Sequence, residues 1–502
     1  MITCASIFSD NMVLQRDKSI SIWGYAHSFD IIRVTLNNIS VETETLKNNI
    51  WSLQLPPMGA TTDLTMIVKN LTSNESITFT NIAIGEVWLC GGQSNMEFEL
   101  QNIKGAIDEL NVCELSNVRC FQPQKNAYID EYFYMNEKFN CWQMPSKNTC
   151  KRWTAVGYLF AKMISKELNI TVGIINCNWG GTSGSAWVSR EKLLSHEDTK
   201  VYVQEYDKAI EGKSFEDYCK ELEDYENYVA QWQPKINKFY SKNPNGLWGD
   251  ALAFAGECKY PGPIGYKSEF RPCGVYETML KKISPYALRG FIYYQGESDD
   301  HRPNSYYTLL NEVISQWRED WHDDTLPFLI VQLPMHMERG DTDHKNWCVI
   351  RQAQDRVHRT IKNTGLAVIL EHGEYGNIHP TNKLPVAERL FLQAMYHVYH
   401  RIDSNLAYGG LYKSHVITNG GILVNFDYIT HGFNVTGELS NFEISSSDGV
   451  YYPADVKIYD NKIFLSSKEV KYPVHARYLW TNHAEIHLYS NDSGIPVAPF
   501  NF

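Results

Sequence analysis

Gly-Gly-Gln-Ser-Asn-Met at residues 91–96 stands directly behind Ile-Ala-Ile-Gly-Glu-Val-Trp-Leu-Cys at residues 82–90. The latter stretch is short, apolar and rich in branched and aromatic side chains, which predicts a buried strand. A helix can begin near residue 96, so Ser94 is expected where a strand passes into a helix. Such a turn holds a serine hydroxyl clear of the sheet, beside free backbone N–H groups. An esterase nucleophile needs this geometry, although a solvated serine in a glycine-rich turn accounts for the segment equally well.

A histidine follows a second predicted strand far along the chain. The apolar run at residues 366–370 predicts a buried strand, and a loop leads from it to Ile-His-Pro at residues 378–380. Pro380 removes a backbone donor and fixes the chain after His379. The chain has 16 histidines, so any single one is more often a surface or hydrogen-bonded residue than a catalyst. The carboxyl end of a late buried strand is nevertheless where α/β enzymes place catalytic groups.

Two further predicted strands end in glycine-rich turns. Residues 172–178 predict a strand that turns at Trp-Gly-Gly-Thr-Ser, where Gly181 or Gly180 can offer a bare N–H to an oxyanion. Residues 288–294 predict a strand that ends in Gln-Gly-Glu-Ser-Asp, where the amide of Gln295 can donate into the same site. Each turn alone is an ordinary strand-to-loop connection. Four such turns, each supplying a different catalytic part, together favour a hydrolase site.

The ordered set of motifs resembles the sialate O-acetylesterase group of the SGNH (GDSL-like) hydrolases. The likeness extends over essentially the whole chain, carried strongly by residues 91–96, 178–182, 293–299 and 378–380 and more weakly by 6–16, 154–158, 480–482 and 494–500. The resemblance implies an α/β fold, with an SGNH-hydrolase-like parallel sheet core and small flanking β domains. It implies removal of O-acetyl groups from sugars, chiefly sialic acids. Close relatives deacetylate plant polysaccharides, so acetylated xylan- or mannan-type oligosaccharides are the alternative substrates.

Carried over residue by residue, the resemblance assigns Ser94 as the nucleophile and His379 as the general base. The N–H groups of Ser94 and Gly181, with the amide of Gln295, would form the oxyanion hole, and Gly180 is the near alternative to Gly181. A third hypothesis is a carbohydrate-binding protein built on a decayed hydrolase core. Binding requires neither a nucleophile nor a base, so the intact set of residues argues against this hypothesis.

The chain departs from the family at the acid of the triad. Relatives can carry aspartate three or two residues before the histidine, where this chain has Gly376 and Asn377. Glu374 is the nearest carboxylate and the first candidate to orient His379. The rival is a backbone carbonyl, which can also accept a hydrogen bond from Nδ1–H.

The composition predicts a soluble enzyme with neither a nucleic-acid nor a membrane partner. The net charge is −12, and no run is dense in Lys or Arg. No apolar run approaches the roughly 20 residues of a membrane span. The 11 cysteines are scattered without a CxxC, and no signal peptide is visible, so we expect a cytoplasmic protein. No metal-ligand spacing stands out, and we expect no cofactor; the substrate would be an O-acetylated sugar.

The pattern divides the chain into three parts. Residues 1–80 alternate apolar and polar side chains in short runs, which predicts a small β domain. Residues 81–403 alternate buried strands with helical stretches, the pattern of a parallel sheet covered on both faces. Within them, residues 190–240 predict an inserted helical pair near the active-site mouth, either a substrate lid or a solvated hairpin. Residues 404–502 return to short strands and predict a second β domain.

Overall fold

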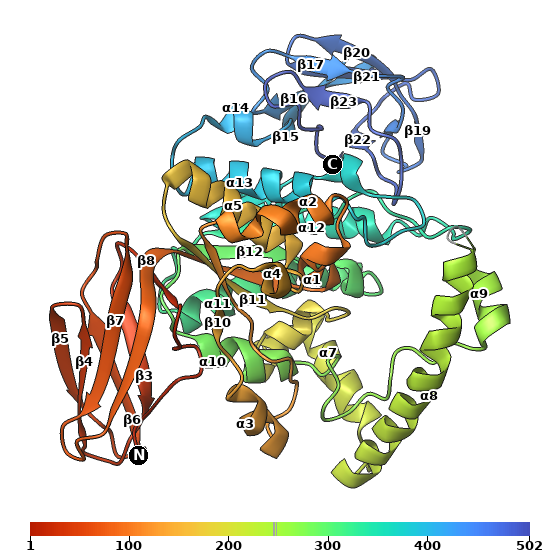
Figure 1. The fold of residues 1–502 in the computed structure, drawn as a ribbon. Coiled ribbons are helices and arrows are strands. Elements are labelled where there is room, and N and C mark those ends of the chain that lie inside the picture. The colour runs from red at the N-terminus through yellow and green to blue at the C-terminus, as the bar shows by residue number, and fades with distance from the viewer. Residues whose placement is uncertain (244–245, 247) are drawn as a thin grey trace.

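A computed structural model describes residues 1–243, 246 and 248–502, and a parallel sheet lies at its centre (Figure 1). This sheet confirms the expected α/β fold. Apart from the first part of β8, every residue of its parallel strands is buried, which explains why they read as unbroken apolar runs. From edge to edge the strands are β10 Trp142–Gln143, which is antiparallel, β9 Val118–Phe121, β11 Val172–Asn178, β8 Ser76–Gly92, β12 Gly290–Tyr294, β13 Phe328–Val331 and β14 Thr364–Ala367.

Helices cover both faces of this sheet. Successive residues of a strand point to opposite faces, and a side chain added at Gly91 would meet Trp317 of α11, whereas the thiol of Cys90 lies against Gly157 of α5. Helix α5 (Ala155–Leu168) packs against α13 (Leu384–His397), and α11 (Tyr306–Asp320) packs against α12 (Asn346–Thr360). The shorter helices are α1 Ser94–Glu97, α2 Ala106–Val112, α3 Glu131–Glu137, α4 Lys147–Cys150, α10 Lys281–Ile283 and α14 Ser404–Ala407.

The N-terminal β domain is continuous with the central sheet through β8. The first half of this 17-residue strand pairs with β7, and its second half lies between β11 and β12. The boundary expected near residue 80 therefore falls inside one strand. The remaining strands of the domain are β1 Thr3–Cys4, β2 Val13–Gln15, β3 Ile20–Tyr25, β4 Ile31–Leu36, β5 Ile39–Glu44, β6 Ile50–Leu55 and β7 Thr61–Asn70.

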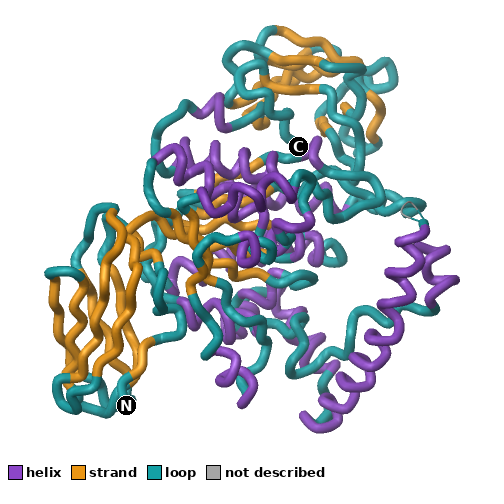
Figure 2. Tube along the Cα trace, in the orientation of Figure 1, coloured by secondary structure: helices purple, strands orange, loops and turns teal. Residues whose placement is uncertain are grey.

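The C-terminal strands form separate small antiparallel sheets above the helices α5 and α13 (Figures 1 and 2). They begin just after α14, close to the expected boundary at residue 404. Their bounds are β15 Leu411–Thr418, β16 Gly421–Asp427, β17 Phe433–Val435, β18 Phe442–Ser445, β19 Tyr451–Pro453, β20 Asp455–Tyr459, β21 Lys462–Ser466, β22 His475–Tyr478, β23 Leu488–Ser490 and β24 Phe500–Asn501.

The insertion expected at residues 190–240 divides into two structures. Helices α6 (Arg190–Leu194) and α7 (Glu197–Ala209) pack on the main core through side chains such as Leu193 and Val203. Helices α8 (Phe215–Lys242) and α9 (Trp248–Ala255) form an arm at one side of the molecule, with a small core of their own around Trp232 and Ala251. The pairing partner of α8 thus lies beyond residue 240. Among the described residues, no helix is long and apolar enough to cross a membrane.

Candidate active site

Ser94 begins helix α1 at the carboxyl end of β8, where Gly92 lies very close to the backbone of β12. Gly92 has φ of +129°, and a Cβ there would lie 2.1 Å from the carbonyl oxygen of Tyr294. No other residue fits that space or conformation. The next N–H, of Gln93, donates to the same Tyr294 carbonyl. The close approach of β12 explains Gly92, whereas Gly91 is required because a Cβ there would collide with the Trp317 ring.

Strand β8 lies where the order of the sheet reverses. The chain passes from β8 to β9 and β11 on one side and then to β12, β13 and β14 on the other. In open α/β sheets, a crevice forms outside the carboxyl ends of the strands at such a reversal. The loops that follow β8, β11, β12 and β14 carry Ser94, Gly181, Gln295 and His379 respectively.

Ser94 and His379 are brought together in this crevice. The Oγ atom of Ser94 lies 2.7 Å from Nε2 of His379. The histidine loop is held from two sides, because the N–H of His379 donates to Oδ1 of Asn377 and the carbonyl of Ile378 accepts from Nδ2 of Asn95. Burial, followed by the nearby charges of Lys383 and His336, lowers the pKa of His379. The imidazole is therefore neutral at pH 7, as a general base must be.

The third member of the predicted triad does not reach the histidine. The exposed Glu374 carboxylate accepts a hydrogen bond from Nδ2 of Asn377 at 2.7 Å, and its backbone carbonyl accepts from Nδ1 of His336 at 3.0 Å. Among the described residues, Nδ1 of His379 has no hydrogen-bond partner, neither a carboxylate nor a backbone carbonyl. The structure thus presents a Ser94–His379 pair and leaves the orienting group unassigned.

Two backbone N–H groups beside Ser94 are available to an oxyanion. The turn after β11 passes directly beside the serine, since a Cβ at Gly180 would lie 3.4 Å from Cβ of Ser94. Gly180 already donates its N–H to Oε2 of Glu97 at 2.5 Å. The N–H groups of Ser94 and Gly181 have no partner within the described part of the chain. The geometry therefore favours Gly181 over Gly180 as the second donor.

Gln295 lies in the centre of the site but directs its amide elsewhere. Its Nε2 donates to Oδ2 of Asp299 at 2.5 Å and lies 3.2 Å from Oε1 of Gln93, while its Oε1 accepts from the hydroxyl of Tyr306. Both amide hydrogens thus have acceptors inside the protein. The shorter of the two hydrogen bonds goes to Asp299, an acid four residues further along the same turn. In place of the expected donation to an oxyanion, Gln295 links the turns after β8 and β12.

Asp299 is a site residue that the sequence reasoning missed. It is fully buried and accepts hydrogen bonds from Ser183, Gly184 and Tyr202 as well as from Gln295. These partners come from the turn after β11 and from α7, so the carboxylate fixes the Gly181 turn relative to β12. The acid at the end of the Gln-Gly-Glu-Ser-Asp motif could have indicated Asp299, but the motif does not reveal which groups this carboxylate contacts.

A buried ionic network behind the serine was also missed. Lys383 donates to Oδ1 of Asn95, and Nδ2 of Asn95 donates to Oε1 of Glu297 at 2.6 Å. Lys383 and Glu297 are 1% and 5% exposed. Burial lowers the pKa of Lys383 to about 8 and raises that of Glu297. Because Asn95 also holds the carbonyl of Ile378, this network ties the nucleophile helix to the histidine loop.

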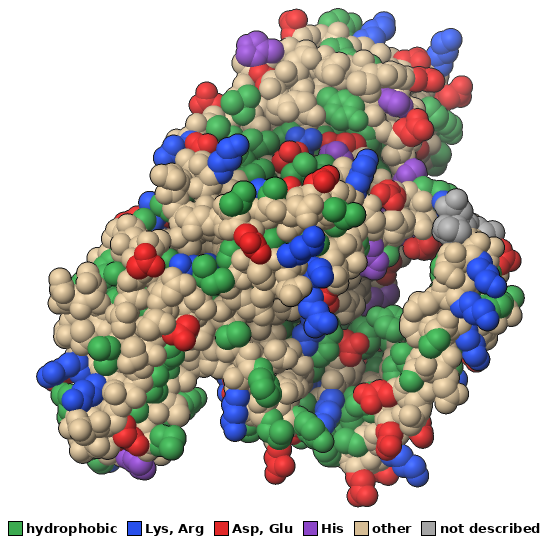
Figure 3. Space-filling view, viewed as in Figure 1, with side chains coloured by type: hydrophobic (Ala, Val, Ile, Leu, Met, Phe, Trp, Pro, Cys, Tyr) green, Lys and Arg blue, Asp and Glu red, His purple; other side chains and the backbone are tan. Residues whose placement is uncertain are grey.

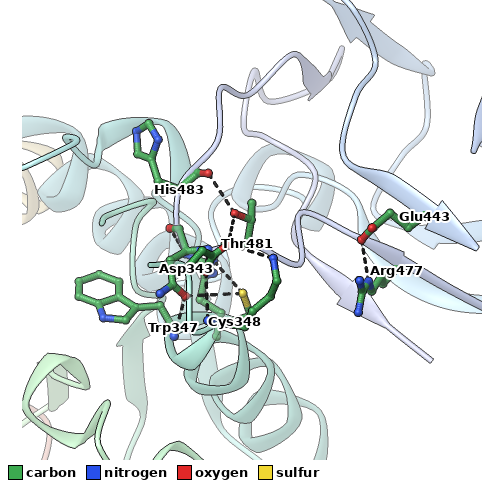
Figure 4. Close-up of polar contacts among 10 residues, drawn as sticks. Asp343, Trp347, Cys348, Glu443, Arg477, Thr481 and His483 are labelled. Atoms are coloured by element: carbon green, nitrogen blue, oxygen red, sulfur yellow. Dashed lines mark hydrogen bonds and ion pairs between the residues drawn. The ribbon is translucent and has the colours of Figure 1, made fainter. Parts of the chain in front are cut away.

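The C-terminal β domain reaches the site through residues 481–483 (Figure 4). Thr481 donates to Oδ2 of Asp343, and Oδ1 of Asn482 accepts the N–H of Trp347 at the start of α12. The carbonyl of Asn482 accepts the N–H of His336, the residue that holds the Glu374 carbonyl. The weak sequence motif at residues 480–482 is therefore a brace for the loop that carries His379.

Comparisons with known proteins agree with this geometry. Residues 266–382 match the family model described as carbohydrate esterase, sialic acid-specific acetylesterase. The match covers the segment that carries both Gln295 and His379. Sialate O-acetylesterases from Mus musculus and Homo sapiens are 25% and 24% identical, over 99% of this chain and 93% and 91% of their own length. A carbohydrate acetylesterase from Xanthomonas citri has the same fold, with a TM-score of 0.78 and 23% identity, over 100% of this chain and 99% of that one.

Proposed function

We propose that this esterase removes O-acetyl groups from carbohydrates with Ser94 as the nucleophile and His379 as the base. The observation that carries the proposal is the 2.7 Å contact between Ser94 Oγ and His379 Nε2, in the crevice where the strand order reverses. A serine hydroxyl paired with a neutral imidazole is an activated nucleophile. The match of residues 266–382 to the esterase family model and the similarity to sialate O-acetylesterases over 99% of the chain support the same reaction.

The geometry supports a two-step acetyl transfer. Oγ of Ser94 bonds to the acetyl carbon while its proton passes to Nε2 of His379, and the N–H groups of Ser94 and Gly181 stabilise the oxyanion. The ester bond to the sugar then breaks, and the sugar oxygen takes the proton from His379. Water next attacks the acetyl-enzyme, gives its proton to His379, and releases acetate with the proton returned to Ser94.

The family description and the mammalian relatives name sialic acids, so these are the first candidate substrate class. Neutral acetylated oligosaccharides are the second candidate. A specific observation favours this second class: the cleft beside Gly181 is aromatic, and within the described part of the chain no Lys or Arg lines it.

A covalent label tests the mechanism directly. A fluorophosphonate phosphorylates an activated serine, so mass spectrometry of the treated protein should find one adduct on the peptide that contains Ser94. Acetate release from ethyl acetate should stop in proportion to labelling. Labelling at another serine, or full activity after complete labelling of Ser94, would exclude the assignment. His379→Ala is the matched variant, since it should abolish labelling while leaving Ser94 in place.

A further inference from the structure

A cleft of about 390 Å³ opens directly beside the Gly181 turn. One wall comes from α7, with Tyr202 and Tyr206, and the opposite wall comes from the segment after α9, with Tyr260 and Phe270. Catalysis as described above uses none of these side chains. The α8–α9 arm carries the chain out from α7 and back to Tyr260, so the far wall is supplied by the insertion.

The aromatic wall lies beside Gly181, the proposed oxyanion donor. A Cβ at Gly181 would lie 2.8 Å from the hydroxyl of Tyr260 and 3.4 Å from the ring of Phe270. Tyr260 and Phe270 meet edge to face, with centroids 5.8 Å apart, and Tyr260 is 59% exposed. When the carbonyl oxygen of an ester points at the Gly181 N–H, other parts of the same small molecule are within reach of these rings. The apolar C–H face of a sugar ring packs well on an exposed aromatic face.

The charge of the cleft favours an uncharged sugar. Its lining includes the carboxylate of Glu205 and, among the described residues, no Lys or Arg. The nearby guanidinium of Arg302 pairs with that same Glu205. His301 also lines the cleft. A sugar carboxylate bound here would lose water and meet Glu205 without a free guanidinium or ammonium to compensate, which is unfavourable.

Other cationic side chains near Ser94 lie outside the aromatic cleft. Lys125 pairs with Glu97 and lines a different hollow, together with Arg152. Lys383 is buried behind Ser94 and bonded to Asn95. Arg339 lines a third hollow, together with Gly376 and Asn377 of the histidine loop. An anionic substrate would have to lie toward Lys125 and Arg152 or toward Arg339, outside the aromatic cleft. The two substrate classes therefore predict different binding sites.

We infer that the cleft beside Gly181 is the subsite for the sugar ring of a neutral O-acetylated carbohydrate, with Tyr260 and Phe270 as its platform. The inference rests on the proposed esterase function and names the substrate class for that site. Tyr260 supplies the exposed ring face, and Glu205 disfavours acidic sugars.

Three acetate-releasing substrates test this subsite: an O-acetylated methyl xyloside, 9-O-acetylated N-acetylneuraminic acid and ethyl acetate. In Tyr260→Ala, kcat/KM for the xyloside should fall at least tenfold more than kcat/KM for ethyl acetate, which has no ring to stack. Tyr472→Ala is the control, because Tyr472 is 70% exposed on the C-terminal domain, and it should leave all three rates unchanged. Equal losses on xyloside and ethyl acetate in Tyr260→Ala would overturn the subsite.

A second variant tests the effect of the Glu205 charge. Glu205→Gln leaves Arg302 unpaired, so kcat/KM for the sialic acid ester should rise several-fold relative to the xyloside. Glu211→Gln, at an exposed position just after α7, is the matched control. A native enzyme that prefers the sialic acid ester tenfold or more, or a Glu205→Gln variant with an unchanged ratio, would overturn the neutral class. If native protein releases no acetate from any of the three substrates, the proposed function fails instead.

Discussion

The turn that carries Ser94 and the loop that carries His379 meet at 2.7 Å, but they are built differently. In the serine turn, Gln93 and Asn95 are buried, and their side chains are hydrogen-bonded to the loop after β12. In the histidine loop, Glu374 and Tyr375 are exposed at the rim of a hollow of about 1000 Å³. Figure 3 shows an open gap between the α8–α9 arm and the rest of the molecule at this side. The nucleophile is thus held by buried hydrogen bonds, whereas the base lies in a loop that is partly exposed.

The largest effect should come from a change in the turn that carries Ser94. Ser94→Ala removes the nucleophile and should lower kcat by several powers of ten, as in serine hydrolase triads. The melting temperature should hardly change, because His379 is the one hydrogen-bond partner of the half-buried Ser94 side chain among the described residues. Acetate release measured beside thermal unfolding checks both statements. Activity within tenfold of the native protein would show that another group attacks the ester.

Lys383→Met should have the next largest effect, because it breaks the link between the serine turn and the histidine loop. Buried Glu297 would lose its nearby cation, and Oδ1 of Asn95 would lose its donor, which costs about 1–3 kcal/mol for a buried group left unsatisfied. The positive charge of Lys383 also lowers the pKa of His379. Without it the pKa should move up toward its usual value, so activity at pH 5.5–6 should fall more than activity at pH 8.

The pH profile separates this positioning role from simple damage. A general base works when neutral, and a raised pKa moves the acid limb of kcat/KM to higher pH. Lys413→Met, which removes an exposed lysine from β15, is the control and should leave the limb in place. A Lys383→Met variant that is less stable but keeps the native acid limb would contradict the electrostatic link to His379.

Gln295→Ala should reduce both stability and turnover. The change removes the side chain that links Asp299, Gln93 and Tyr306 inside the core, and it leaves buried partners unsatisfied at about 1–3 kcal/mol each. The fall in kcat should therefore accompany a lower melting temperature. A direct oxyanion donor would behave differently, with roughly a hundred- to thousandfold loss of kcat and unchanged stability. That second outcome would show that the amide turns toward the substrate.

The distance along the sequence between contacting residues explains which features of the site could be predicted. Ser94 and His379 each follow a buried apolar strand, a pattern within about 15 residues, so their placement at strand ends was expected. The direction of the Gln295 amide depends on Asp299, whose other partners Ser183 and Tyr202 lie in distant segments. The bond between Lys383 and Asn95 joins residues 288 positions apart. Such contacts follow from the packing of the whole sheet, and no local pattern encodes them.

The smallest effect should come from Glu374, the carboxylate first considered for the triad. It is exposed and bonded to Asn377, so Glu374→Gln keeps an acceptor oxygen for that bond and removes a charge that His379 does not contact. We expect kcat to change less than about threefold, because no stabilised imidazolium partner is lost. Asn377→Ala is the informative companion, since it removes the Oδ1 acceptor of the His379 N–H and should cost more than Glu374→Gln. A loss of a hundredfold or more in Glu374→Gln, at native stability, would show that the loop closes on substrate binding and that Glu374 then reaches Nδ1. The expected order, Asn377→Ala worse than Glu374→Gln, would instead show that the histidine loop works through its backbone contacts.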